Sequence, residues 1–412
     1  MTEPKIRFLK EDGNFFPKWE TTFIGDIVER QEHPVKVDKE VEYREIGIRS
    51  HGKGIFHKDP VTGKELGNKR VFDIVPDCLV LNIVFAWERA VAKTTTDEVG
   101  MIASHRFPMY KPKDGILDLD YIVRYLISDK GKKILELASP GGAGRNRTLG
   151  QKAFMESELP LPCYEEQKKI AEFFDKIDDV ISNVEKELEA YIRLKAGMLQ
   201  KMFPRNGSRV PEVRFPGFTE DWEQRKLGEL GSFKNGMNFS KDAMDKGYPF
   251  VNLQNIFGRN IIDTDNLGLA EASDNQLKEY NLQKGDVLFV RSSVKLEGVG
   301  EAAIVPKNLE KTTYSGFVIR FRDEADMDIN FKRFIFGTKP IRDQIMAKAT
   351  NSANKNISQD VLNNLKLYLP IKAEQQKIGE YFSNLDNLIT LHQHEHEVWL
   401  SIKKGYIKKM FI

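Results

Sequence analysis

The sequence has few cysteines and no long apolar stretch. Cys78 and Cys163 are the only two cysteines among 412 residues. Two are too few for a disulfide framework, and this pair lacks the spacing of metal ligands. No segment approaches the roughly 20 apolar residues that span a bilayer, and the N-terminal segment has no apolar signal core. These absences predict a soluble protein of a reducing cytoplasm, with no membrane partner.

An excess of one charge sign is also missing. The chain has 63 Lys and Arg against 61 Asp and Glu, for a net charge of +2. This balance gives no global sign of nucleic-acid binding, so such a function must rest on local features. The 26 Phe and 12 Tyr residues argue against disorder. At roughly 100–200 residues per domain, the length predicts two or three domains with their own cores.

The common catalytic motifs are absent too. There is no phosphate-binding loop of the Gly-x-x-x-x-Gly-Lys-Ser/Thr type and no Asn-Pro-Pro-Phe/Tyr motif of an adenine methyltransferase. No nucleophile and base stand together. Asp77 and Glu88, near Lys93, are candidates for nuclease carboxylates, but we interpret them as solvated surface charges. The sequence therefore predicts a chain that is not an enzyme by itself.

An internal repeat organises the chain. Residues 161–204 align without a gap onto residues 369–412 at an offset of 208. Identical pairs include Glu166/Glu374, Gln167/Gln375, Ile170/Ile378, Phe174/Phe382, Asp178/Asp386 and the closing Lys-Met-Phe. A weaker echo opens each half, where Arg7-Phe8 and Trp19-Glu20 match Arg214-Phe215 and Trp222-Glu223. The repeat predicts two globular regions, 1–160 and 223–368, each followed by a conserved helix at 161–204 or 369–412, with a linker at 205–222.

Both repeated segments have the pattern of a coiled-coil helix. Apolar residues recur at alternating steps of four and three, as in Ile170, Phe174, Ile177, Ile181, Val184, Leu188 and Tyr191. If the second globular region has its ends close together, the second helix starts near the end of the first. We therefore expect an antiparallel coiled coil with a pseudo-twofold axis. The alternative is that each helix packs on its own globular region as an ordinary surface helix.

His392 and His396 form the one apparent metal signal, because imidazoles four residues apart on a helix can chelate an ion. They occupy the seam positions matched by Val184 and Leu188. Polar seam residues weaken a coiled coil but can fix its register. We interpret both as seam histidines and predict no metal site.

The globular regions have a mixed α/β pattern. Residues 286–291 and 317–322 alternate apolar and polar residues like strands, whereas 121–137 and 331–349 are typical of helices. The predicted fold is two α+β domains joined by two long helices.

Polar and basic clusters recur at matched places in the two regions. Arg and Lys suit guanine edges or phosphates, and Asn and Gln suit adenine. The DNA-contacting candidates of the first region are Arg49, His51, Lys53, Trp87, Arg89, His105, Arg106, Arg145, Asn146 and Arg147. Those of the second are Gln254, Asn255, Arg259, Arg291, Ser292, Ser293, Lys295, Tyr314, Asn351, Asn354, Lys355 and Asn356. Ordinary turn or surface positions are the alternative for any single cluster, but their recurrence favours binding.

Together these features resemble the specificity subunits of type I restriction-modification systems, the HsdS family. The resemblance rests on two divergent regions, each followed by a Leu-Pro-x-x-x-Glu-Gln helix, and on Arg-Phe-Pro-Gly-Phe-x-x-x-Trp-Glu at 214–223. It implies two target-recognition domains, each reading one half of a bipartite site in double-stranded DNA, with the coil setting the spacer. The implied partners are two methyltransferase subunits and restriction/translocase subunits in a prokaryotic cytoplasm. S-adenosylmethionine, ATP and Mg belong to those partners, and no cofactor is expected in this chain.

Two other functions stay open on the sequence. A coiled-coil adaptor that binds only proteins would have the same helices. A self-sufficient methyltransferase or nuclease would need the motifs that are missing.

Overall fold

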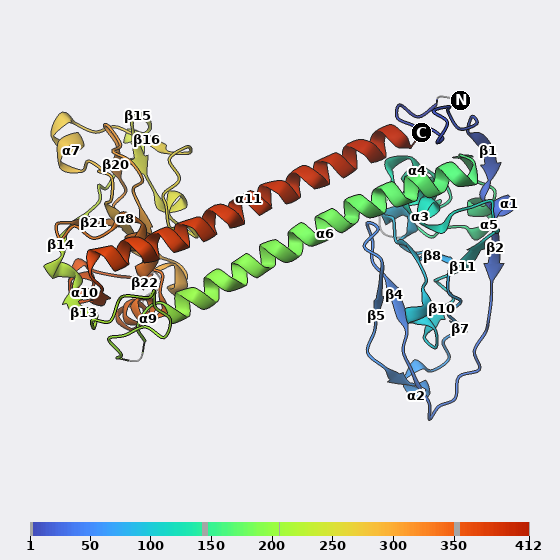
Figure 1. Ribbon diagram of the computed structural model, residues 1–412, viewed down its shortest axis with the longest axis horizontal. Coiled ribbons are helices and arrows are strands. Elements are labelled where there is room, and N and C mark those ends of the chain that lie inside the picture. The colour runs from blue at the N-terminus through green and yellow to red at the C-terminus, as the bar shows by residue number, and fades with distance from the viewer. Residues whose placement is uncertain (1–2, 142–146, 206, 350–354, 412) are drawn as a thin grey trace. The chain divides into compact units, whose positions relative to one another are not determined.

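The computed structural model describes residues 3–141, 147–205, 207–349 and 355–411 of the chain. The chain divides into two compact units. Unit 1 comprises Met1–Val184 and Glu395–Ile412, and unit 2 comprises Glu185–His394. Two long helices, α6 (Tyr164–Lys201) and α11 (Lys372–Met410), contribute to both units (Figure 1). Each unit therefore holds one globular domain and parts of both helices.

Unit 1 is built on a four-stranded antiparallel sheet. Its strand order is β2 (Val28–Gln31), β11 (Met109–Pro112), β8 (Leu79–Leu81) and β9 (Val91–Lys93). The remaining elements are the strands β1 (Glu20–Phe23), β3 (Glu42–Tyr43), β4 (Ile46–Ile48), β5 (Ile55–His57), β6 (Val61–Thr62), β7 (Val71–Asp73), β10 (Ile102–Ser104) and β12 (Glu158–Leu161), and the helices α1 (Ile24–Ile27), α2 (Gly63–Leu66), η1 (Ala86–Glu88), η2 (Thr96–Glu98), α3 (Leu119–Ile127), α4 (Asp129–Leu137) and α5 (Gln151–Met155).

Unit 2 repeats this architecture. Its main sheet has the order β14 (Gly231–Asn235), β21 (Val318–Asp323), β17 (Val287–Val290) and β19 (Ala302–Ile304). The other elements are the strands β13 (Glu223–Lys226), β15 (Met244–Val251), β16 (Gly268–Ala270), β18 (Ser292–Ser293), β20 (Thr313–Tyr314), β22 (Lys355–Asn356) and β23 (Lys366–Leu369), and the helices η3 (Leu227–Glu229), η4 (Lys241–Ala243), η5 (Leu253–Asn255), α7 (Asp274–Glu279), η6 (Leu296–Gly298), α8 (Ile329–Ile335), α9 (Lys339–Lys348) and α10 (Gln359–Asn363).

The two sheets match strand for strand. At one edge, β2 pairs with β11 and β14 pairs with β21. At the other edge, β9 pairs with β8 and β19 pairs with β17. A short antiparallel ladder, β1 with β12 or β13 with β23, ties the start of each domain to the segment before its long helix. The prediction of two mixed α+β domains with long helices is therefore confirmed, and the internal repeat extends into the globular domains.

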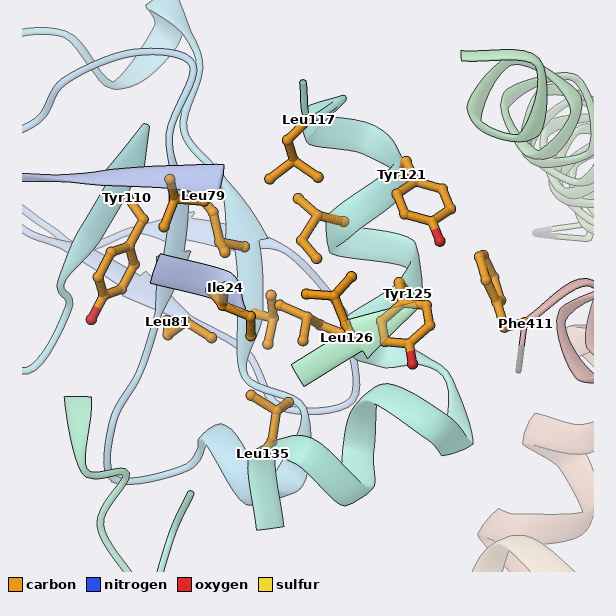
Figure 2. Close-up of a cluster of buried hydrophobic side chains, with 14 of the residues drawn as sticks. Ile24, Leu79, Leu81, Tyr110, Leu117, Tyr121, Tyr125, Leu126, Leu135 and Phe411 are labelled. Carbon is orange, nitrogen blue, oxygen red and sulfur yellow. The ribbon is translucent and has the colours of Figure 1, made fainter. Parts of the chain in front are cut away.

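The helix next to each sheet starts at an acidic cap and buries an aromatic stripe. The Asp118 side chain accepts a hydrogen bond from the Tyr121 amide at 2.8 Å, and Asp328 accepts one from Phe331 at 2.9 Å. Such caps satisfy amides that the first helical turn leaves unpaired. In unit 1, Tyr121 and Tyr125 are buried and face Phe411, the residue after α11 (Figure 2).

The long helices pack antiparallel within each unit. In unit 1 the rings of Phe173 and Tyr406 lie 4.9 Å apart, and those of Phe174 and Phe411 lie 5.9 Å apart. In unit 2, Tyr191 of α6 stacks on His392 of α11 at 5.2 Å. Further along α6, Asp178 contacts Lys403 in unit 1 and Lys195 contacts Asp386 in unit 2. Within each unit, higher numbers along α6 thus meet lower numbers along α11, as expected for an antiparallel coiled coil.

The apolar seam also serves the domains. Ile170, Phe174, Ile177 and Ile181 of α6 belong to the same buried cluster as the sheet of unit 1. Ile378, Phe382 and Leu385 of α11 join the core of unit 2 in the same way. The two packing modes weighed from the sequence therefore coexist, because the first half of each helix contacts both its domain and the other helix.

The seam histidine His392 stacks on Tyr191 and places Nδ1 at 3.7 Å from a carboxylate oxygen of Glu187. Across the part of the chain that the structure describes, no group of three or more metal-ligating side chains gathers. No helix in the same part is both long and apolar enough to cross a membrane.

Candidate functional site

The repeated Glu-Gln pair fixes each domain on its helix. Glu166 is fully buried and accepts hydrogen bonds from Arg7 Nε at 3.1 Å, Arg7 Nη2 at 2.7 Å and Trp19 Nε1 at 3.1 Å. Glu374 accepts two from Arg214, at 2.7 and 2.8 Å. The hydrogen bond to Glu166 raises the pKa of Arg7 even though burial acts to lower it. A bidentate ion pair of this kind sets the orientation of the arm that precedes each domain.

The neighbouring glutamine holds the helix of the domain. Gln167 accepts a hydrogen bond from the Asp118 amide at 2.8 Å and donates to the carbonyls of Pro162 and Ile116. Gln375 accepts from the Asp328 amide at 3.0 Å and donates to a proline carbonyl at 2.9 Å. Each glutamine thereby joins a long helix to the capped start of α3 or α8.

A matched charged triad connects the domain to both helices. In unit 1, Asp178 lies 2.8 Å from Arg124 Nη1 and 2.5 Å from Lys403 Nζ. In unit 2, Asp386 lies 3.0 Å from an Arg333 nitrogen and 2.5 Å from Lys195 Nζ. The aspartate comes from the helix that follows the domain, the arginine from the domain and the lysine from the other helix. The aspartate therefore links the domain to both long helices.

In unit 1 the candidate loop between β4 and β5 lies against η1. The amide of His51 donates to the Glu88 carbonyl at 2.8 Å, and the Gly52 amide donates to the Arg89 carbonyl at 2.9 Å. His51 has a φ of 62°, in the left-handed region, which turns the loop tip. Arg49 lies over the ring of Phe56 at 4.8 Å, and Lys53 is exposed. The loop and η1 thus form one surface.

The other candidates of unit 1 lie beside this surface. Arg147 lies over the ring of Trp87 at 5.5 Å. Arg89 forms an ion pair with Asp129 of the same domain, with Nη2 at 2.6 Å from Oδ1. The exposed His105 and Arg106 are next to Ile83, whose amide donates to the Arg106 carbonyl at 3.0 Å. Arg145 and Asn146 lie outside the described residues.

A cavity of about 310 Å³ opens next to His105 and Arg106. Glu45 and Asn82, both nearly buried, contribute to its wall. Glu45 accepts hydrogen bonds from Lys69 at 3.1 Å and Lys58 at 3.5 Å. Its complete lining is Glu45, Lys58, Lys69, Asn82, Val84, Phe85, Ser104, His105, Arg106 and Phe107.

In unit 2 two candidate clusters that are distant in sequence come together. Strand β18 pairs with β22, so that Ser292 lies opposite Asn356 and Ser293 opposite Lys355. The Ile357 amide donates to the Arg291 carbonyl at 3.0 Å, which extends the same contact. Asn351 and Asn354 lie outside the described residues. Lys295 follows β18 and is exposed.

An apolar cavity of about 510 Å³ adjoins this strand pair. Its lining is Leu253, Phe257, Ser292, Ser293, Val294, Lys295, Glu297, Gly298, Glu301 and Phe317. Val294 and Phe317 are strongly exposed. The residue types that predict base and phosphate contacts are mostly polar, so the candidates do not include these two residues or Phe257. The signal was an apolar residue inside the polar run Arg291-Ser-Ser-Val-Lys295.

Two candidates of unit 2 require correction. Asn255 is 1% exposed, and its amide donates to the carbonyls of Asp263 and Asn266 at 3.1 and 3.0 Å. Tyr314 is fully buried, and its hydroxyl donates to the Lys234 carbonyl at 3.3 Å. Both side chains organise the domain and present no surface to a partner in this structure.

The last two candidates are exposed but stand apart from the strand pair. Gln254 lies on the outer side of η5. Arg259 lies 3.6 Å from Asp263 and lines a separate, charged cavity of about 830 Å³ with Arg333 and Asp386. This charged cavity surrounds the triad at the base of the domain.

The cavity of about 310 Å³ in unit 1 and the cavity of about 510 Å³ in unit 2 occupy the same place in the repeated fold. Each is lined by residues that follow the third strand of the main sheet, β8 or β17, and by a phenylalanine that precedes the second, β11 or β21. Because the sheets match, one position of the fold holds a cavity in both units, and the lining residues differ between the two. This arrangement suits two related sites with different ligand preferences.

Comparison with known proteins places both halves in one family. The family described as "Type I restriction modification DNA specificity domain" matches residues 17–193 and again 219–398. The specificity subunit of the type I restriction enzyme MjaVIII from Methanocaldococcus jannaschii is 25% identical over 403 residues, covering 94% of this chain and 90% of that protein. The EcoKI specificity subunit of Escherichia coli is 24% identical over 248 residues, 56% of this chain and 52% of that protein.

Solved structures share the fold. The HsdS subunit from Thermoanaerobacter tengcongensis superposes with a TM-score of 0.54 at 16% identity, covering 96% of this chain and 97% of that one. The type I restriction-modification S subunit from M. genitalium gives a TM-score of 0.57 at 15% identity, covering 100% and 99%.

Proposed function

Because the chain belongs to the type I restriction modification DNA specificity family, which matches it twice, we propose that it is the sequence-reading subunit of a type I restriction-modification complex. Unit 1 reads one half of a bipartite site in double-stranded DNA, and unit 2 reads the other. The observation that carries this proposal is the matched position of the two cavities, which are lined by different residues in the two units. Two similar domains with different binding surfaces suit two half-sites of different sequence.

The chain recognises the DNA sequence, and its partner subunits catalyse the reactions. Two methyltransferase subunits dock on the repeated helices, because a pseudo-twofold repeat offers two similar surfaces to two copies of one partner. Those subunits bind S-adenosylmethionine, and restriction/translocase subunits bring ATP and Mg. The complex works in the prokaryotic cytoplasm. The antiparallel coil sets the distance between the half-sites, as spacing does for a dimer on a palindrome.

Selection from a random duplex library tests the proposal. The full-length chain, alone and with a methyltransferase subunit of its system, is used to capture DNA. We expect a split motif with a spacer of fixed length. Capture of partner protein without any sequence enrichment would instead support the adaptor function, and methyl transfer by the chain alone would support an enzyme.

Matched variants then assign the halves. The two variants are Arg106→Ala and Arg291→Ala. Arg106 lies on the surface of unit 1, and Arg291 lies beside the strand pair of unit 2. Loss of one base-reading contact costs about 1–3 kcal/mol of discrimination. Each variant should relax the sequence of one half only, and the two should affect opposite halves. An equal loss in both halves from either variant contradicts the modular assignment.

A further inference from the structure

The apolar cavity of unit 2 is unusual because its apolar side chains face solvent. Val294 is 79% exposed, Phe317 56% and Phe257 37%, and all three line the same cavity of about 510 Å³. Scattered exposed apolar residues need no explanation, but a cluster around one hollow marks a binding site. None of the three contributes to a buried core cluster of the unit. Their position is therefore better explained by a ligand than by folding.

Hydroxyl and charged groups surround the hollow. Ser292, Ser293 and Lys295 line it directly, and Lys355 lies opposite Ser293 in the strand pair. Two carboxylates also line the cavity. The Glu301 carboxylate accepts a hydrogen bond from the Gly258 amide at 2.8 Å, which fixes its position within the domain. Glu297 is exposed at the edge.

DNA offers one apolar group to such a hollow. In the major groove the base edges present hydrogen-bond donors and acceptors, and thymine adds an apolar C5-methyl group. Resting on the proposed function of unit 2, we propose that Val294 and Phe317 form a subsite for the C5-methyl group of a thymine in the half-site that unit 2 reads. The hydroxyls and lysines at the rim contact the neighbouring base edges and phosphates.

The equivalent cavity of unit 1 has a different lining. There Glu45 and Asn82 are buried in the wall, and Lys58 and Lys69 bind the Glu45 carboxylate. Its exposed apolar side chain, Phe85, is 38% exposed, against 79% for Val294 and 56% for Phe317 in unit 2. The subsite is therefore assigned to unit 2, where the apolar side chains are the more accessible.

Removing the methyl group from DNA tests the subsite directly. The full-length chain with its methyltransferase partner is titrated with the selected duplex, and each thymine in turn is replaced by deoxyuridine. At one position in the half-site of unit 2 we expect binding to weaken about fourfold, the value of one buried methyl group. Thymines of the other half should not report on this cavity.

Two variants connect the effect to the cavity. Val294→Thr keeps the side-chain shape but replaces a methyl with a hydroxyl, and Phe317→Ala removes the ring. Both positions are exposed, so folding should be unaffected. Each variant should bind the thymine and deoxyuridine duplexes about equally. Leu269→Ala is the matched control, because Leu269 is 42% exposed in β16 of the same unit and does not line the cavity. It should keep the fourfold ratio.

The outcomes separate the subsite from the function. If no sequence is selected, the proposed function fails, and the subsite with it. If a split motif is selected but its unit 2 half contains no thymine, the subsite is overturned while the function stands. The same conclusion follows if deoxyuridine binds as well as thymine, or if Val294→Thr and Phe317→Ala leave the ratio unchanged.

Discussion

Arg7 binds Glu166 through two guanidinium nitrogens, at 3.1 and 2.7 Å, and Arg214 repeats this pair with Glu374 in the second half of the chain. Both carboxylates are fully buried. The two halves are therefore joined to their helices by the same contact even where their domains differ. Domains can diverge in the surfaces that contact DNA because the joint beneath them stays constant.

Glu166→Gln tests this joint. The substitution keeps the side-chain shape but leaves the Arg7 charge without its carboxylate, and breaking a buried ion pair costs about 3–5 kcal/mol. We expect faster hydrogen exchange at the start of α3 and the N-terminal arm, with unit 2 unchanged. Glu374→Gln is the matched control and should affect α8 instead. If either variant loosened both units equally, the joints would not be independent.

The ring of Phe411 completes the aromatic cluster of unit 1. It faces Tyr125 (Figure 2). Its ring centroid lies 5.6 Å from that of Tyr125 and 5.9 Å from that of Phe174, and the residue is 2% exposed. Removing a buried Phe side chain costs about 3–5 kcal/mol. Phe411→Ala should therefore release the end of α11, seen as rapid exchange of its last two turns and a lower unfolding midpoint.

The exposed Leu400 lies on the same helix and provides the control. Leu400→Ala should change the free energy of unfolding by no more than about 0.5 kcal/mol. Hydrogen exchange at the end of α11 and the unfolding midpoint should therefore stay close to those of the unmodified chain. Phe203→Ala should reproduce the Phe411→Ala effect in unit 2, because Phe203 packs on Phe331 and Phe382 there. An unaffected unit 2 would show that the two helix ends are not equivalent.

Cys78 makes unit 1 sensitive to alkaline pH. Burial raises the pKa of its thiol from 9.0 to about 11. Between these values the unfolded chain releases a proton that the folded chain keeps, so stability is full below pH 9 and falls as the pH rises toward 11. Urea unfolding followed at about pH 8 and about pH 10.5 should show this loss.

Cys78→Ala should reduce that pH dependence without abolishing it. Tyr110 remains, and burial raises the pKa of its hydroxyl from 10.0 to about 12, so it adds a loss of the same sign at higher pH. The comparison uses the change between the two pH values and is therefore independent of any constant cost of the substitution. Identical pH dependence in both proteins would exclude the buried thiol as its source.

The long helices were predictable because residues repeated in both copies form the contacts that hold each domain on its helix. Glu166, Gln167, Asp178 and the closing Lys-Met-Phe each have a structural partner, so the sequence had to be kept in both copies. The strands of the matched sheets are three to six residues long, and β8 and β17 share little beyond apolar character. Their equivalence depends on pairing between distant segments, which a single sequence does not display.

The binding surface was only partly predictable for a related reason. Residue type indicated that Asn255 could contact a base, but the loop folds back so that its amide is used within the loop. Val294 was overlooked because apolar residues usually enter the core, and only the structure places it in solvent. The pairing of Ser293 with Lys355 joins two clusters that the sequence separates by about 60 residues.

The length of the coil offers the most direct test of the spacing role. One heptad inserted after Val184 in α6 and one after His394 in α11 fall at the boundary between the units, so the contacts inside each unit are kept. Seven residues lengthen a helix by about 10 Å, and DNA rises about 3.4 Å per base pair. The selected motif should keep both half-sites but gain about three base pairs of spacer. An insertion in α6 alone should instead prevent assembly, because antiparallel helices of unequal length cannot satisfy the triads at Asp178 and Asp386 together. An unchanged spacer in the doubly lengthened chain would exclude the coil as the element that sets the distance.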